Sequence, residues 1–175
     1  MKFYPGQFIF FSILILTVAG CSSHRKVSAK KDNESRQRSY YEKKLGVEIP
    51  YYGNLKLYAA IDRWIGVPHK LGACETSGID CSCLVSVLCR EAYECNTPRD
   101  TKGLMESCRK IEVNELKEGD IVFFSIKNGR ADHVGLFLSN GKFVHTSIKR
   151  GVMISDLKEN YYTKYFAGAG RLKCS

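Results

Sequence analysis

The spacing of apolar residues changes near the middle of this chain, and that change limits the folds it can adopt. In the first half the apolar residues follow a helical period. In the second half they alternate or run together between turn residues, as in antiparallel strands. Helices followed by strands predict an α+β domain, with helices packed on one face of an antiparallel β-sheet. The expected helices are 55–65, 81–93 and a short helix and loop within 101–110, and the expected strands are 120–124, 133–138, 142–146, 151–155 and 166–172.

Length and composition leave room for one globular domain and a short extension. The chain has 175 residues, of which 44% are hydrophobic and 26% charged. Its net charge of +9 suggests an anionic partner, and its eight cysteines suggest disulfides or a metal. Where these residues lie along the chain decides between those possibilities.

The first twenty residues have the pattern of an export signal. Lys2 precedes an apolar run over 8–18, which would form only about 16 Å of helix and is too short to span a membrane. The run ends in Val18-Ala19-Gly20-Cys21, which resembles the lipobox of bacterial lipoproteins. We therefore expect a signal peptide over 1–20 and a lipid on Cys21; a plain signal peptide is the alternative.

Residues 21–45 are predicted to be a basic, flexible tether without apolar content to pack. Within 22–44, eight Lys and Arg stand against three acidic residues, a net charge of +5. Lys2 in the signal carries one more positive charge, so only +3 of the total remains for 45–175. The tether suits either an anionic headgroup layer or the role of a solvated spacer. Nucleic acid is not an expected partner, because the folded part carries no basic stripe and no recognisable reader motif.

Cys81, His133 and His145 are the candidate catalytic residues. Asp80 is a plausible N-cap, so Cys81 would lie at a helix N-terminus, where the helix dipole lowers a thiol pKa. A cysteine nucleophile also needs a base, and the base needs an orienting partner.

The hairpin between the two histidines decides whether they can meet. A plain two-residue Asn-Gly turn would place them on opposite faces of the sheet. A three-residue loop over 139–141, with Gly141 left-handed, would place residue 135 opposite His145 and make His133 its diagonal neighbour on the same face. We expect the second arrangement.

Four stretches carry a family resemblance: "GVPHKLGACETSGIDCSCLVSVLCREAY", "LKEGDIVFF", "DHVGLFLSNGKFVHTS" and "GVMISDL". In this order, over about residues 46–172, they resemble the NlpC/P60 family of cell-wall cysteine peptidases. The resemblance implies a papain-like fold in permuted order, with Cys81 as nucleophile, His133 as base and His145 as orienter. It implies cleavage in peptidoglycan stem peptides, at γ-D-glutamyl–diaminopimelate or D-alanyl–diaminopimelate bonds, without a cofactor.

Three positions depart from the family pattern. His69 stands where a tyrosine is usual, Ala73 replaces the second glycine of a pair, and Cys83 replaces the glycine after D-C-S. We take His69, Asp80 and Ser82 as candidate substrate-binding residues. Cys83 could pair with Cys81 in a regulatory disulfide.

The cysteines other than Cys21 and Cys81 have no pairing that the sequence assigns. Six of them could pair in 15 ways, and their spacing does not fit a zinc site, so no metal is expected. These six are Cys74, Cys83, Cys89, Cys95, Cys108 and Cys174.

The sequence thus predicts a lipid-anchored cysteine peptidase of the cell envelope, with its catalytic domain over 46–175. We expect a monomer on the periplasmic face of the outer membrane, acting on peptidoglycan stem peptides. Two alternatives stay open: a non-catalytic envelope binding protein, and an amidase or acyltransferase using the same residues.

Overall fold

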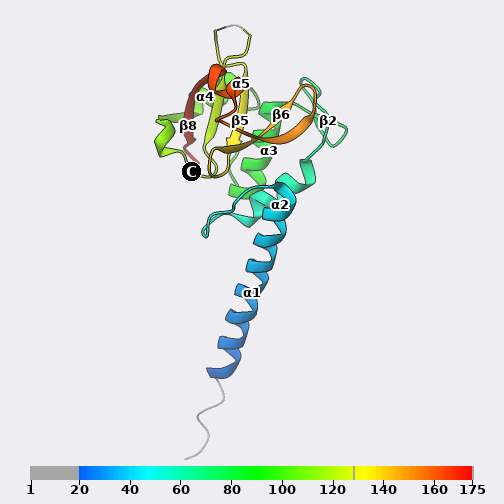
Figure 1. Ribbon diagram of the computed structural model, residues 1–175, viewed down its shortest axis with the longest axis vertical. Helices are drawn as coiled ribbons and strands as arrows, with labels where there is room; N and C mark the ends of the chain where they lie inside the picture. The colour runs from blue at the N-terminus through cyan, green and yellow to red at the C-terminus, as the bar shows by residue number, and fades with distance from the viewer. Residues whose placement is uncertain (1–19, 128, 175) are drawn as a thin grey trace, which may run out of the picture. The chain divides into compact units, whose positions relative to one another are not determined.

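The structure is a computed structural model that describes residues 20–174 except residue 128 (Figure 1). The chain divides into two compact units, residues 1–35 and residues 36–175. The expected signal peptide lies outside the described residues, apart from Gly20. Among the described residues, no helix combines the length and the apolar character needed to cross a membrane.

The expected tether is helical, so the prediction of a flexible coil is wrong for these residues. Helix α1 spans Gly20–Leu45. Its sequence is polar but rich in Lys, Arg, Glu and Gln, whose straight side chains lose little freedom in a helix. Lys30 and Glu34 lie one turn apart, with Nζ and Oε1 separated by 4.0 Å. Low apolar content excluded a packed core here but did not exclude a helix.

The second unit includes the last turns of α1 and so begins before the boundary expected at residue 46. The Arg38 guanidinium donates hydrogen bonds to the carbonyl oxygens of Ile49 (3.2 Å) and Tyr51 (2.7 Å). The Glu42 carboxylate accepts from the Ile49 N–H at 3.0 Å. These contacts fix the chain that leads into the next helix.

The helices of the first half agree with the apolar pattern. Helix α2 spans Leu55–Trp64 and is capped by Asn54, whose side chain accepts from the Lys56 N–H. Helix α3 spans Cys81–Tyr93 and is capped by Asp80, and the short α4 spans Thr101–Ser107. The expected start of α3 at Cys81 is therefore confirmed.

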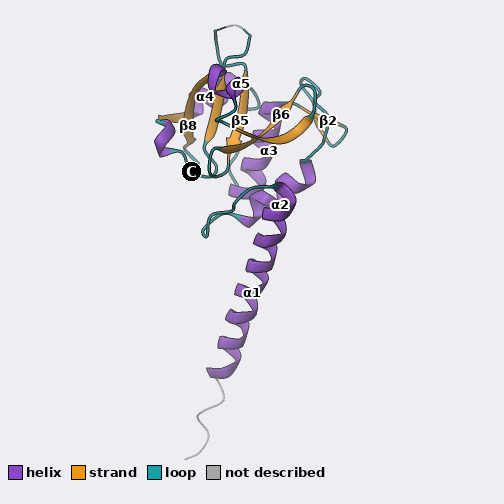
Figure 2. Ribbon diagram, viewed as in Figure 1, coloured by secondary structure: helices purple, strands orange, loops and turns teal. Residues whose placement is uncertain are grey.

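The second half forms a six-stranded antiparallel sheet, in the order β3-β8-β4-β5-β6-β7. Strands are drawn in orange in Figure 2. All five expected strands are present. The sequence missed β3, the two-stranded β1–β2 ribbon, the 3-10 helix η1 and the helix α5. The bounds are β1 Cys74–Glu75, β2 Gly78–Ile79, β3 Cys108–Ile111, η1 Val113–Glu115, β4 Ile121–Phe124, β5 His133–Phe137, β6 Lys142–Ser147, β7 Gly151–Asp156, α5 Asn160–Tyr165 and β8 Phe166–Leu172.

The sheet is covered on both faces, whereas helices were expected on one. Helices α2 and α3 pack with one side of β4, β5 and β6 in the larger hydrophobic core. A smaller core on the other side of these strands gathers Phe124, Phe143 and Tyr162, the last from α5. Because α5 is only six residues long, it showed no helical period in the sequence.

The β5–β6 hairpin has the register that we predicted, with Gly135 opposite His145. The loop differs in detail. Asn140 (φ 49°) and Gly141 (φ 80°) are both left-handed, and the Ser139 carbonyl accepts from the Lys142 N–H at 2.7 Å. Leu138 also donates its N–H to Lys142, so two residues face one, as in a bulge. The bulge supplies the one-residue offset that a plain two-residue turn would lack.

Candidate active site

Cys81 is the first residue of α3 and approaches the start of β5. The backbone of Val134, next to His133, and the backbone of Ser82 and of Cys81 itself favour the thiolate and lower the thiol pKa, but burial acts in the opposite direction and is the larger effect. The net result is a raised pKa for Cys81, so the lowering expected from the helix dipole alone is overridden.

The two strand histidines meet, as the register requires. His133 Nε2 and His145 Nδ1 are 3.0 Å apart, with the rings almost perpendicular. Burial is the main cause that lowers the pKa of His133, to about 4, and that of His145, to about 3. Both rings are therefore neutral at pH 7, and the pair shares one hydrogen bond.

His145 has a second set of partners on its opposite ring nitrogen. Its Nε2 lies 3.1 Å from Ser155 Oγ and 3.0 Å from the Tyr162 hydroxyl. The Ser155 hydroxyl in turn donates to Tyr162 Oη at 3.3 Å. Phe143 packs beside the imidazole, with ring centroids 5.0 Å apart. Sequence reasoning missed Ser155 and Tyr162, because no local motif links them to a histidine on another strand.

The contacts made by His133 Nε2 determine what this site can do chemically. They leave Nδ1 of the ring to accept a proton from a thiol. A neutral thiol can form the nucleophile at the moment of reaction if it transfers its proton to a neutral imidazole within reach. The N–H groups of Cys81 and Ser82 at the start of α3 can stabilise negative charge on an attacked carbonyl oxygen.

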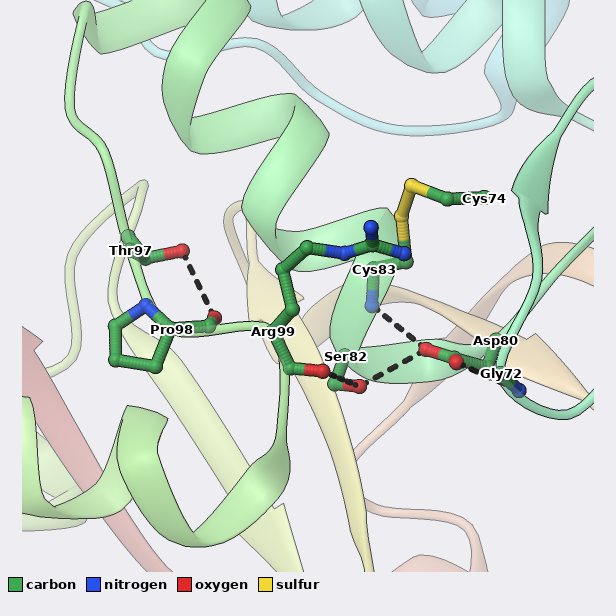
Figure 3. Close-up of a disulfide and its surroundings, with 8 residues drawn as sticks. All are labelled: Gly72, Cys74, Asp80, Ser82, Cys83, Thr97, Pro98 and Arg99. Carbon is green, nitrogen blue, oxygen red and sulfur yellow. Dashed lines mark hydrogen bonds between the residues drawn. A yellow bond between two sulfur atoms is a disulfide. The ribbon is translucent and has the colours of Figure 1, made fainter.

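Asp80 and Ser82 are turned to internal contacts (Figure 3). Asp80 accepts from the Cys83 N–H (2.7 Å), the Gly72 N–H (3.0 Å) and the Ser82 hydroxyl (2.9 Å). Ser82 Oγ also lies 2.8 Å from the Arg99 carbonyl. Both residues are buried, so their side chains hold the start of α3, in contrast to the substrate contact that we expected of them.

Cys83 forms a disulfide with Cys74, which joins α3 to the β1 strand (Figure 3). The Cα atoms of the two residues are 5.7 Å apart. This pairing differs from the suggested Cys81–Cys83 bond and leaves the Cys81 thiol free. The sulfur of Cys83, two residues after Cys81, therefore anchors the loop that precedes α3.

His69 lies in the loop between α2 and β1. It forms an isolated parallel bridge with Ile79, just before the Asp80 cap, and is half-buried. Its charge is one of the influences that lower the pKa of His133, which places it near that ring. A substrate-binding role for His69 stays a prediction.

The remaining cysteines lie away from the site. Cys95 and Cys174 form a second disulfide, and Cys89 and Cys108 are free. Burial raises the pKa of Cys89 to about 12 and that of Cys108 to about 11. In the part of the chain that the structure describes, no group of three or more His, Cys, Asp or Glu side chains could hold a metal ion.

A thiol at a helix N-terminus, together with a hydrogen-bonded histidine pair on adjacent strands, has the composition of a cysteine hydrolase site. The sequence profile described as "NlpC/P60 family" matches residues 66–171. The chain therefore belongs to the NlpC/P60 family, which includes cysteine peptidases named as murein endopeptidases.

Two curated relatives and one solved structure illustrate the similarity. "Probable endopeptidase NlpC" of Escherichia coli K12 is 32% identical over 95% of this chain and 99% of its own. "Murein DD-endopeptidase MepS/Murein LD-carboxypeptidase" of the same strain is 37% identical over 62% of this chain and 57% of its own. An NlpC/P60 family protein from Bacillus cereus is similar in fold, with a TM-score of 0.61, 24% identity and coverage of 71% of this chain and 42% of its own.

Proposed function

We propose that this protein is a peptidoglycan endopeptidase that cleaves an amide bond in stem peptides or their cross-links, with Cys81 as nucleophile. The observation that carries the proposal is the 3.0 Å contact between His133 and His145, in a family domain that places Cys81 beside the same strand. The printed names of the relatives, a probable endopeptidase and a murein DD-endopeptidase, supply the substrate class.

The reaction divides into two half-reactions. His133 takes the Cys81 proton on Nδ1, and the thiolate attacks the amide carbonyl carbon. The oxyanion receives hydrogen bonds from N–H groups at the start of α3, and the protonated His133 gives its proton to the departing amine. A thioester on Cys81 remains. Water, deprotonated by His133, then attacks the thioester and releases the peptide carboxylate, while the thiol recovers its proton.

The buried setting favours this order of events. Because burial holds both histidine rings neutral and the thiol protonated, no ion pair exists before the substrate arrives. Charge separates only as the amide carbonyl is attacked, when the oxyanion donors can compensate it. His145 keeps the Nε2 proton of His133 directed away from Cys81, so that Nδ1 stays an acceptor.

Digestion of purified muropeptides tests the activity and defines the bond. The wild-type protein is incubated with monomeric and cross-linked muropeptides, and products are identified by mass spectrometry. We expect cleavage within the peptide, lost by at least about 100-fold in Cys81→Ser and kept in Cys108→Ser, a matched variant at a free cysteine outside the site.

Other product patterns would replace the proposal. Binding without cleavage by the wild type would indicate an envelope binding protein. A cut between the sugar and L-alanine would indicate an amidase, and a product joined to an added amine would indicate an acyltransferase. Undiminished cleavage by Cys81→Ser would remove Cys81 from the reaction.

We also propose that Cys21 carries a lipid that holds the protein in the cell envelope. The proposal rests on the lipobox-like Val18-Ala19-Gly20-Cys21 after an apolar run. Labelling of bacterial cells with an alkyne palmitate analogue should mark the full-length protein and not the Cys21→Ala variant. Equal labelling of the two proteins would contradict the anchor.

A further inference from the structure

The hydroxyl groups of Ser155 and Tyr162 close off the inner end of the histidine pair. They come from β7 and α5, two elements that contribute no other group to the site described above. Ser155 is 3% exposed, Tyr162 7% and His145 1%, so bulk water does not compete for these contacts. Two oxygens therefore compete for a single ring nitrogen, at 3.1 and 3.0 Å.

The positions of the protons on His133 and His145 are linked through the hydrogen bonds that join these groups. If His133 accepts the thiol proton on Nδ1, its neutral ring must carry hydrogen on Nε2. That hydrogen points at His145 Nδ1, which must then be the acceptor. His145 consequently carries its own hydrogen on Nε2, and this N–H needs an acceptor inside the protein.

The opposite tautomer of His145 would disable the base. Hydrogen on His145 Nδ1 would make His133 Nε2 the acceptor and move the His133 hydrogen to Nδ1, the atom that must receive the thiol proton. The state of Nε2 on His145 therefore decides whether His133 can act. Ser155 Oγ can accept from that N–H while donating its own hydrogen to Tyr162 Oη at 3.3 Å.

We propose that Ser155 and Tyr162 are positioning residues that select the Nε2–H tautomer of His145 and, through it, keep His133 competent as a base. They touch neither the substrate nor the thiol and act only through His145. The inference rests on the proposed function for its catalytic consequence, but the tautomer itself can be measured in the resting protein.

Removal of the Ser155 and Tyr162 hydroxyls leaves the charged groups around the hydrogen-bonded histidines unchanged. Arg150 lowers the pKa of both His145 and Tyr162, and Glu159 raises that of Tyr162. At the other end, Asp132 raises and His69 lowers the pKa of His133. Because neither hydroxyl is charged at pH 7, their removal changes hydrogen bonding and not the net charge.

The test combines nitrogen NMR of the histidine rings with kinetics. Wild-type protein, Tyr162→Phe, Ser155→Ala and the double variant are compared, with Tyr161→Phe as control because its exposed ring lies next in sequence. In the wild type and the control, His145 should show protonated Nε2 and unprotonated Nδ1. The double variant should show a substantial Nδ1–H population.

The kinetic arm uses stem-peptide cleavage. We expect kcat to fall by about tenfold in each single variant and further in the double variant, with KM unchanged, since one hydrogen bond of ordinary strength is lost. The acid limb of the kcat/KM profile should move to lower pH, because the protonated His133 loses support. A purely structural role would change neither the tautomer nor this limb.

The outcomes separate the inference from the proposed function. An unchanged His145 tautomer in the folded double variant would overturn the inference, whatever the activity. A tautomer shift in a protein that cleaves no stem peptide would support the positioning role and reject the endopeptidase. Loss of the fold in the double variant would leave the two single variants to decide by the same ring signals.

Discussion

Two polar clusters of this domain satisfy their hydrogen-bonding groups in different ways. The histidine chain (His133, His145, Ser155 and Tyr162) lies at the start of β5 and contains no charged group at pH 7. The carboxylate cluster (Glu118, Asp120, Arg171, Tyr58 and Tyr93) lies near the start of β4 and the end of β5. It combines two carboxylates and one guanidinium with two tyrosine hydroxyls.

In the carboxylate cluster each charge has dedicated partners. Asp120 accepts two hydrogen bonds from Arg171, from Nε and a terminal nitrogen, both at 2.7 Å. Glu118 accepts from the Tyr58 hydroxyl at 2.7 Å and from the Asn54 N–H at 2.8 Å. Removal of one member of such a set leaves the other polar groups without their partners, which costs stability.

In the histidine chain the protonated, positively charged rings have no partner that stabilises them. Burial lowers the pKa of both rings, and among the described residues no carboxylate is hydrogen-bonded to either. Under the proposed function, the fold assigns stability to the carboxylate cluster and proton transfer to the histidine chain. Four predictions test this division, from the largest effect to the smallest.

Removal of the base should have the largest effect on activity and a small effect on folding. We expect His133→Ala to lower kcat/KM for stem-peptide cleavage by at least about 100-fold, because a positioned general base contributes about 10² to 10⁴. A steady-state assay with a defined muropeptide measures this, and a circular dichroism melt checks the fold. Activity within a few-fold of wild type would show that another group takes the proton.

Removal of one charge from the carboxylate cluster should reverse this pattern. Asp120→Asn leaves the half-exposed Arg171 without its anion, and we expect a loss of about 2 kcal/mol in the free energy of unfolding. Cleavage per folded molecule should stay near the wild-type value. The matched variant Glu106→Gln, in an exposed helical pair with Lys102, should lose less than about 1 kcal/mol. Equal losses in the two variants would contradict the contrast.

Acid should weaken the fold through the histidine chain. In the folded protein the pKa values of His133 and His145 lie below the ordinary 6.5. Between pH 6.5 and these lower values, the unfolded chain therefore binds more protons than the folded one. The contribution of the two neutral rings to the free energy of unfolding is present above pH 6.5. It is lost as pH falls toward 4 and 3, by about 1.4 kcal/mol per pH unit for each ring. Urea denaturation across this range should show the slope, reduced by about half in His133→Asn. A flat profile from pH 6.5 to 4 would contradict the buried, neutral pair.

The turn that joins β5 to β6 should have the smallest effect. Gly141 is left-handed (φ 80°), and an added Cβ would lie 3.0 Å from Asp156 Oδ1. We expect Gly141→Ala to cost about 1–2 kcal/mol in stability, and Gly141→Asn less, because asparagine tolerates this conformation. Activity at a permissive temperature should remain, since the strand register aligns the histidines. An equal or larger loss in Gly141→Asn would contradict this reason for the glycine.

Local patterns predicted the parts of the site that depend on neighbouring residues. The cap at Asp80 and the start of α3 follow from residues within a few positions of Cys81. The register of β5 and β6 follows from the short loop over 139–141, although a bulge at Leu138 and Ser139 produces the offset in a different way.

Features that depend on distant packing were not predictable. Tyr162 reaches His145 from α5, and Cys74 pairs with Cys83 across a loop, so neither relation has a local signature. The raised pKa of Cys81 was missed because burial, which only the fold reveals, outweighs the helix N-terminus. The helical state of residues 20–45 was missed because their polar composition was taken to mean coil.

Capture of the covalent intermediate tests the central claim, that Cys81 forms a thioester with the acyl part of a stem peptide. Wild-type protein is mixed with muropeptide, quenched in acid within the first turnovers and analysed by intact mass and peptide mapping. The account predicts an added mass equal to the acyl fragment, located on Cys81 and absent from Cys81→Ser. An adduct on another residue, or continued turnover by Cys81→Ser, would contradict it.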